Sequence, residues 1–92
     1  MTKEHYDALL AVAEAKPGTG GWAELAEDRS LTLHVSGNGS SLSVSRVVAL
    51  RHSGTLLFAR TSKGDQYVLA LEDVFAGAVD AAKQSGRQAG FR

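Results

Sequence analysis

Apolar and polar residues alternate with a period of two through the middle of the chain, which is typical of half-buried β-strands. The alternation begins at Leu31, is interrupted by the turn sequence GNGS, and resumes at Leu42 in SLSVSRVVALRH. It continues in TLLFART after a turn at Ser53-Gly54, and in QYVLALE after a turn across residues 63–65. Because each link is too short for anything but a hairpin, the pattern predicts a four-stranded antiparallel meander.

Helical periodicity replaces this alternation before residue 29. Residues 2–16 predict a first helix that Thr2 can cap, and its apolar stripe comprises Tyr6, Leu9, Leu10 and Ala13. The glycine-rich sequence GTGG then predicts a connector, and residues 22–28 indicate one or two further helical turns.

After the meander, Glu72 or Asp73 can cap a last helix with the apolar stripe Phe75, Ala78, Val79 and Ala82. Gly77 lowers the stability of such a helix by about 1 kcal/mol, a cost best explained by close packing on the sheet. The expected fold is α+β: an N-terminal helix, a four-stranded antiparallel meander sheet, and a C-terminal helix packed on that sheet.

The length of the chain predicts one domain over residues 1–92. Within it we expect a helical N-terminal segment at residues 1–28, a ββββα core at 31–85 and a loose tail at 86–92.

Both faces of the predicted sheet carry apolar residues. Twelve positions are assigned inward: Leu31, Leu33, Val35, Leu42, Val44, Val48, Leu50, Leu56, Phe58, Tyr67, Leu69 and Leu71. The opposite face then still carries Val47, Ala49, Leu57, Ala59, Val68 and Ala70. Because a face of this kind avoids water, we expect either the first helix or a second copy of the chain to cover it. The sequence thus favours a homodimer or a protein partner, with those six residues as the interface.

Charge is unevenly distributed along a chain that is neutral overall. Residues 1–28 hold two lysines against six carboxylates, residues 29–63 hold five cations and no acid, and residues 64–92 hold three cations against four acids. The acid-free interval therefore predicts a surface that attracts an anion or a nucleic acid. Lysine and arginine that guard strand edges against unwanted pairing are the alternative explanation.

The residues proposed to contact that anion are Arg46, Arg51, Arg60, Lys63, His34 and Ser43. Arg46 and Arg60 share the parity of the inward leucines, so we expect a β-bulge near Ser45-Arg46 to turn Arg46 away from the core. Stacking aromatic residues are missing from this prediction, because Phe58 and Tyr67 are assigned inward and Trp22 lies outside the sheet.

The sequence contains no motif that indicates an enzyme or a metal-binding protein. The chain has no cysteine, its three histidines lack the spacing of a metal site, and no phosphate loop or nucleophile elbow occurs. We therefore expect no enzyme, no cofactor and no metal. No apolar run approaches the roughly 20 residues that cross a bilayer, and the expected location is cytoplasmic.

The order of four strands and a closing helix, with YVLALEDVFAGAVDAA as last strand and helix, resembles single-stranded-DNA-binding coactivators of the positive-cofactor type and Whirly-like proteins. The strand rhythm of SLSVSRVVALRHSGTLLFARTSKGDQYVLALEDV resembles LytTR-type DNA-binding domains. These resemblances imply a nucleic-acid-binding regulator. The expectation that leads is a small non-enzymatic binding or adaptor module, homodimeric and acting through protein–protein association, with nucleic-acid binding through the arginine-rich strands as the alternative.

Overall fold

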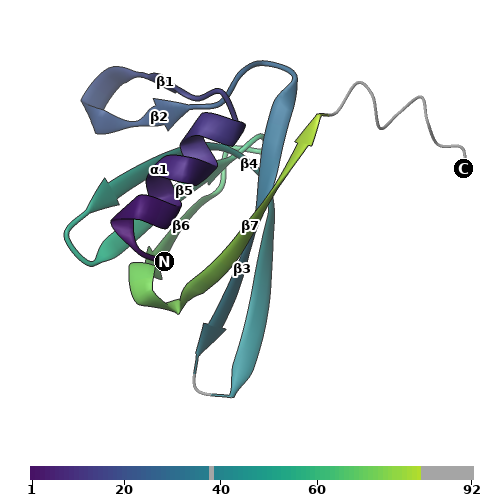
Figure 1. Ribbon diagram of the computed structural model, residues 1–92. Coiled ribbons are helices and arrows are strands. Elements are labelled where there is room, and N and C mark those ends of the chain that lie inside the picture. Colours follow the sequence, from purple (N-terminus) through teal and green to yellow (C-terminus); the bar gives the residue numbers. More distant parts are fainter. Residues whose placement is uncertain (38, 82–92) are drawn as a thin grey trace, which may run out of the picture.

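The computed structural model describes residues 1–37 and 39–81 and shows one helix against one antiparallel sheet (Figure 1). The sheet has seven strands in this part of the chain. The elements, in chain order, are α1 Lys3–Val12, β1 Lys16–Pro17, the 3₁₀ turn η1 Thr19–Gly21, β2 Ala23–Glu24, β3 Arg29–Gly37, β4 Ser40–Ser53, β5 Leu56–Thr61, β6 Gln66–Ala70, the 3₁₀ turn η2 Leu71–Asp73, and β7 Val74–Ala81.

The predicted meander is present as β3–β4–β5–β6, with each neighbour antiparallel. The predicted fold class, a four-stranded sheet between an N-terminal and a C-terminal helix, is nevertheless wrong. β7 adds to the sheet by pairing with β3, and the short strands β1 and β2 extend it beside β4. The protein is therefore mostly sheet, with a single helix in the described part.

The last element is a strand although its sequence also shows a helical stripe. Val74, Phe75 and Val79 favour strands, and the free edge of β3 offers ladder hydrogen bonds over Arg29–Val35. Tertiary pairing therefore overrides the helical periodicity, and the proposed stripe of Phe75, Ala78 and Val79 lies on β7. Ala82 and the predicted tail lie outside the described residues. The resemblances that relied on a closing helix lose that support.

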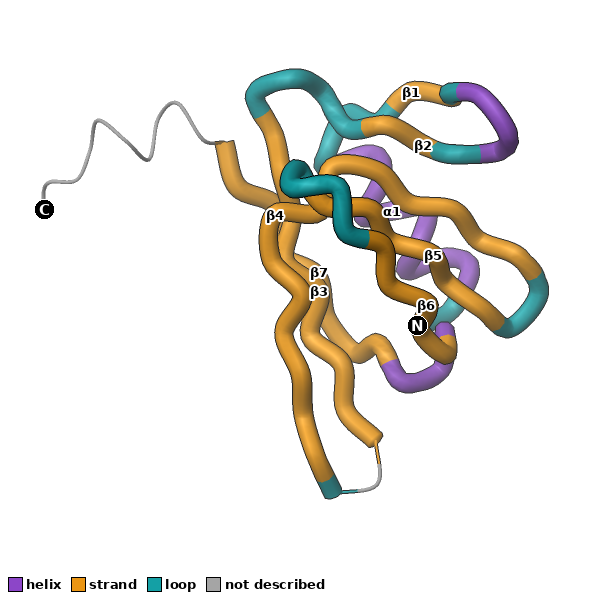
Figure 2. The backbone as a smooth tube through the Cα atoms, turned by 180° about the vertical axis from the view of Figure 1, so that it is seen from behind, coloured by secondary structure: helices purple, strands orange, loops and turns teal. Residues whose placement is uncertain are grey.

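β4 is the strand that both halves of the sheet share. Its first part pairs with β3 and its second part with β5, and Val47 pairs with Leu31 on one side and with Thr61 on the other. Bulges interrupt both ladders, one between the pairs made by Val44 and Val47 and one between those made by Val47 and Ala49. The predicted bulge near Ser45-Arg46 is confirmed, and Arg46 adopts φ 60° there. The β3–β4 hairpin therefore projects as an arm beyond the part that α1 covers (Figures 1 and 2).

α1 forms as predicted but is shorter. Thr2 caps it by accepting a hydrogen bond from the His5 N–H at 3.1 Å, and the helix ends at Val12 instead of continuing to residue 16. Glu14 has a positive φ of 55°, which ends the helical path. The predicted helical turns at residues 22–28 are wrong, because Ala23–Glu24 is a strand that pairs with Ala49 and Leu50.

The core lies between α1 and the concave side of the sheet. It contains thirteen buried side chains: Tyr6, Leu9, Ala13, Leu25, Leu31, Leu33, Val44, Val47, Leu50, Leu57, Ala59, Leu69 and Val74. The sequence assigned the faces correctly for β3 but wrongly for β5, where Leu57 and Ala59 are buried while Leu56 is 41% exposed. Gly77 of β7 lies under the helix, since a Cβ there would come within 2.7 Å of a Leu9 methyl carbon.

Replacing Arg46 tests the bulge. A β-branched residue is strained at positive φ, whereas glycine is not, so we expect Arg46→Val to be about 1–2 kcal/mol less stable than Arg46→Gly. Urea unfolding followed by circular dichroism measures the difference. Equal midpoints for the two variants would contradict a left-handed conformation at this position.

The pH dependence of folding stability tests whether Tyr6 is buried between α1 and the sheet. Desolvation raises the pKa of the Tyr6 hydroxyl, and the carboxylate of Asp7 adds to the effect. The unfolded chain therefore releases this proton at lower pH than the folded chain, so folding stability falls as pH rises above the ordinary tyrosine value of about 10. We expect Tyr6→Phe to flatten the alkaline limb of stability against pH, measured by urea unfolding. An unchanged limb would contradict the assignment.

Candidate binding surface

Two arginines and two aromatic residues meet where the face of β4 and β5 opposite to the core adjoins the β1–β2 hairpin. The guanidinium carbon of Arg51 lies 4.2 Å from the centre of the Phe58 ring and 5.8 Å from that of Trp22. The guanidinium carbon of Arg60 lies 4.5 Å from the Trp22 ring centre. These distances are within the range of cation–π attraction, so the four side chains hold one another in place.

Strand pairing brings two of these residues together. Ser53 pairs with Leu56 across a two-residue turn in which Gly54 has φ 58°. That register sets Arg51 opposite Phe58, and Phe58 opposite Val68 on β6. Side chains directly opposite one another on neighbouring strands share a face, so Arg51, Phe58 and Val68 form one row across three strands.

Trp22 reaches this row from the β1–β2 hairpin. The hairpin is held against β4 because Ala23 pairs with Leu50. Gly21 precedes Trp22 with φ 84°, and a Cβ there would lie 3.7 Å from Cδ of Arg51. The glycine thus provides a backbone conformation that other residues rarely adopt, right beside the arginine side chain.

Two exposed apolar side chains lie on the same face as this row, Leu56 on β5 and Val68 on β6. Leu56 is 41% exposed and Val68 is 59% exposed. We use the term outer patch for the set of Trp22, Arg51, Leu56, Phe58, Arg60 and Val68. It combines apolar area, aromatic rings and positive charge on one rigid surface.

The acidic N-terminal segment partly neutralises the basic interval in space. Nη2 of Arg29 lies 3.1 Å from a carboxylate oxygen of Glu14, and Nη2 of Arg60 lies 3.9 Å from one of Glu24. The glutamates of both pairs are exposed and the arginines are half-buried, so solvent screens the pairs and they contribute little to stability. Within the described residues no carboxylate is within ion-pair distance of Arg51, so the outer patch retains positive charge.

The other predicted anion-contact residues lie elsewhere. Arg46 is exposed at the bulge of β4, and Lys63 is exposed in the turn between β5 and β6. His34 and Ser43 pair across β3 and β4, where Nδ1 of the histidine lies 3.1 Å from Oγ of the serine. Of the six residues that the sequence grouped, the structure brings only Arg51 and Arg60 together around shared aromatic rings.

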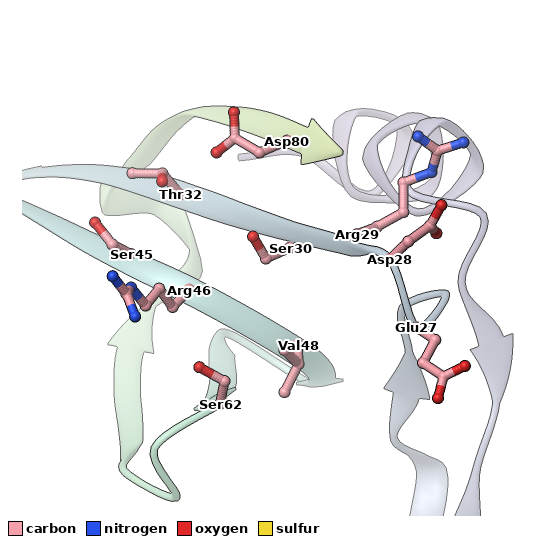
Figure 3. Close-up of a pocket in the computed structure, with 10 residues that line it drawn as sticks. All are labelled: Glu27, Asp28, Arg29, Ser30, Thr32, Ser45, Arg46, Val48, Ser62 and Asp80. Carbon is pink, nitrogen blue, oxygen red and sulfur yellow. The ribbon is translucent and has the colours of Figure 1, made fainter. Parts of the chain in front are cut away.

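Arg46 lines a depression of about 650 Å³ at the bend of the sheet. Figure 3 shows that its charged groups belong to both signs and spread apart instead of converging on one point. The lining residues are Glu27, Asp28, Arg29, Ser30, Thr32, Ser45, Arg46, Val48, Ser62 and Asp80. Such a mixture does not favour a single anion.

The six residues predicted as a protein interface do not form one exposed face in the structure. Val47, Leu57 and Ala59 are buried in the core, and Ala49, which pairs with Arg60, is buried on the opposite face, so none of the four is exposed to a partner. Ala70 is half-buried, and Val68 alone is a large exposed apolar residue. The apolar surface that the structure does expose includes Leu56, which the sequence had assigned inward.

Trp22, Leu56 and Phe58 are the members of the outer patch that sequence reasoning missed. A signal for Phe58 was available, since Leu50 was assigned inward and its neighbour Arg51 therefore belongs to the outward face. The two-residue turn fixes Arg51 opposite Phe58, and this register transfers the outward assignment to Phe58. For Trp22 the sequence held no comparable signal, because its position depends on a hairpin between two-residue strands.

Comparisons with known proteins add no identity. No family model, no curated protein and no solved structure matches this chain. Among residues 1–37 and 39–81, no cluster of three histidine or carboxylate side chains is arranged to hold a metal. No helix in that same part of the chain has the length and apolar character needed to cross a membrane.

Trp22 is the only tryptophan, so its fluorescence reports on the outer patch. Two neighbouring guanidinium groups attract iodide, an anionic quencher, but not neutral acrylamide. We therefore expect Arg51→Gln combined with Arg60→Gln to lower the ratio of iodide to acrylamide quenching constants. Arg46→Gln, which removes a charge that does not lie over Trp22, is the matched control. A ratio that falls equally in the control would contradict the described cluster.

Proposed function

We propose that the protein is a non-enzymatic binding module that acts through protein–protein association, with the outer patch as its docking surface. The observation that carries this proposal is the meeting of Trp22, Arg51, Phe58 and Arg60 beside the exposed Leu56 and Val68. The occupant we propose is a segment of a partner protein that presents carboxylates next to apolar side chains.

The composition of the outer patch supports association with protein. Tryptophan and arginine are enriched among the residues that contribute most to protein–protein binding, whereas lysine and glutamate are depleted at interface centres. None of its six members is a lysine or a carboxylate, although Glu24 lies beside it, 3.9 Å from Arg60. Its arginines are held over aromatic rings before a partner arrives, which reduces the entropy lost on binding.

The positive charge of the patch favours a partner that carries carboxylates. A carboxylate can pair with Arg51 without displacing an existing partner among the described residues. Leu56 and Val68 remove apolar surface from water when an apolar side chain covers them. The patch holds no nucleophile and no group that titrates near neutral pH, so binding, and not catalysis, is the activity proposed.

Nucleic-acid binding is the second candidate, and a specific observation favours it. Single-strand binders combine positive charge with exposed aromatic rings on which bases stack, and the sequence had indicated that such rings were missing. Phe58 in fact lies on the face opposite to the core beside Arg51, and Trp22 lies beside both arginines. The same surface could therefore contact phosphates through two cations and stack with bases.

Selection from a displayed library of random peptides tests the leading proposal. We expect enrichment of peptides in which Asp or Glu flanks aromatic or aliphatic residues, because these complement the two arginines and the apolar row. The double variant Arg51→Glu, Arg60→Glu should lose at least about tenfold in affinity for the enriched peptides, measured by fluorescence anisotropy, since charges of like sign then face each other. Circular dichroism verifies that the variant is folded.

Arg46→Glu is the matched control for this experiment, because it reverses a charge outside the outer patch. It should bind the enriched peptides as the wild type does. If no peptide class is enriched, or if the control loses as much affinity as the double variant, the outer patch is not the docking surface.

Labelled single-stranded oligothymidylate distinguishes the second candidate. If the two arginines neutralise phosphates, the logarithm of the binding constant should fall with the logarithm of salt concentration at a slope of about −1 to −2. Trp22→Ala and Phe58→Ala should each weaken that binding, since stacking contributes roughly 1–3 kcal/mol per base. Oligonucleotide binding with these properties, in the absence of peptide enrichment, would replace the leading proposal.

A further inference from the structure

A cavity of about 340 Å³ lies between α1 and the β1–β2 hairpin. The hairpin begins close to the last turn of α1, because only residues 13–15 separate the helix from β1 (Figure 1). The apolar part of the lining consists of Leu10, Ala15, Pro17, Trp22 and Ala23. A largely apolar cavity with a few polar groups is the usual form of a small-molecule site, and this volume is at the lower end of the range for such sites.

Tyr6 lines the same cavity and brings a hydroxyl group to it from α1. The residue is only 7% exposed, yet its Oη makes no hydrogen bond to any described residue. Buried tyrosine hydroxyls usually have a partner. In the described part of the chain, Nε of Arg29 is the only fully enclosed side-chain nitrogen or oxygen that lacks one. The Tyr6 hydroxyl is therefore not fully enclosed, and the cavity is the space to which it opens.

The Tyr6 hydroxyl is a hydrogen-bond donor at neutral pH. Burial raises its pKa, and the carboxylate of Asp7 raises it further, so the group keeps its proton. A hydrogen bond from such a hydroxyl is stronger when the acceptor oxygen is charged. The cavity thus offers one directed donor to an oxygen atom of a ligand.

Lys16 adds positive charge at the opening of this cavity. It is exposed, lines the cavity, and has no carboxylate within ion-pair distance among residues 1–37 and 39–81. No residue of the lining is acidic. Three carboxylates on the segments that form the cavity are each within ion-pair distance of a cation instead, those of Asp7, Glu14 and Glu24. The lining therefore favours an anionic group over a cationic one.

We propose that this cavity binds a small aromatic carboxylic acid, whose ring covers the apolar lining and whose carboxylate accepts a hydrogen bond from Oη of Tyr6 beside the ammonium group of Lys16. The inference does not rest on the proposed function, because docking at the outer patch requires neither of these two residues. A ligand with one ring and about ten non-hydrogen atoms matches a cavity of this size, and we expect it to bind with a dissociation constant on the order of 0.1–1 mM.

Fluorine NMR with para-fluorophenylacetate as the probe tests the site. At neutral pH its signal should shift and broaden as wild-type protein is added, and the titration gives the dissociation constant. Trifluoroacetate carries the carboxylate without the ring, and para-fluorobenzyl alcohol carries the ring without the carboxylate. Each should bind at least about tenfold more weakly, because each lacks one of the two complementary parts. A para-fluorophenylacetate affinity no higher than that of either fragment would overturn the proposal.

Two variants remove the polar groups one at a time. Tyr6→Phe keeps the ring and removes the hydroxyl, so binding of para-fluorophenylacetate should weaken roughly tenfold. Lys16→Gln changes an exposed side chain and should weaken binding about threefold. Lys63→Gln, which removes the same charge in the turn between β5 and β6, is the matched control and should bind as the wild type does. Circular dichroism verifies that each variant is folded. Wild-type affinity in Tyr6→Phe, or an equal loss in Lys63→Gln, would refute the assignment.

The single tryptophan gives the bound probe a location. Its indole N–H is one resonance in a proton–nitrogen correlation spectrum, and it should shift together with the amides of Ala15 and Gly18, which line the cavity. The amides of Leu56 and Val68 should not shift. Changes at Leu56 and Val68 without changes at Ala15 and Gly18 would place the probe on the outer patch and contradict the cavity as its site.

Val68→Lys distinguishes this inference from the proposed function. It replaces an apolar member of the outer patch, so it should abolish binding of the selected peptides and leave para-fluorophenylacetate binding intact. Tyr6→Phe should do the reverse. Loss of the probe in Val68→Lys with retention in Tyr6→Phe would refute the cavity site, whereas loss of the peptides in Tyr6→Phe with retention in Val68→Lys would refute the outer patch as the docking surface.

Discussion

The bend in β4 is the constraint on which the rest of the structure depends. β4 has 14 residues and divides its ladder between β3 and β5 at Val47. The change of direction requires extra residues in the strand, and the bulges on both sides of Val47 provide them. Arg46 bears the conformational cost through its positive φ. Without this bend the sheet would be flatter, and α1 could not cover a concave core.

The bend also explains why a chain of this size needs only one helix to enclose its core in the described part. Leu9 of α1 contacts the backbone of β7 at Gly77, while Tyr6 lies 5.3 Å from the His52 ring on β4, measured between ring centres. The helix thus bridges the two halves of the curved sheet. β7 completes the enclosure of the core. Its pairing with β3 places Val74 in the core, where that side chain is fully buried.

Curvature sets the face of the sheet that is proposed to bind a partner apart from the face that forms the core. The face opposite to the core carries the outer patch, in which the Trp22 and Phe58 rings orient Arg51 and Arg60. β7 lies beyond β3 from that patch in the strand order of the sheet.

By itself the sequence determined the local structure in which each residue depends on near neighbours. The alternation around Leu31 and Leu33, the turns at Gly54 and Gly64, the Thr2 cap and the bulge at Arg46 are all predictable, because turn chemistry, capping and strand period act over a few residues. Residues 74–81 were not predictable in this way, since VFAGAVDA suits a helix or a strand and only the open edge of β3 decides between them. The meeting of Trp22 with Arg51 and Arg60 likewise depended on register between strands distant in sequence, whereas the faces of β5 follow from the two-residue turn after Ser53. Tertiary structure decided these features because a one-residue difference in register moves every side chain of a strand to the opposite face, and the energy that selects the register comes from the whole core.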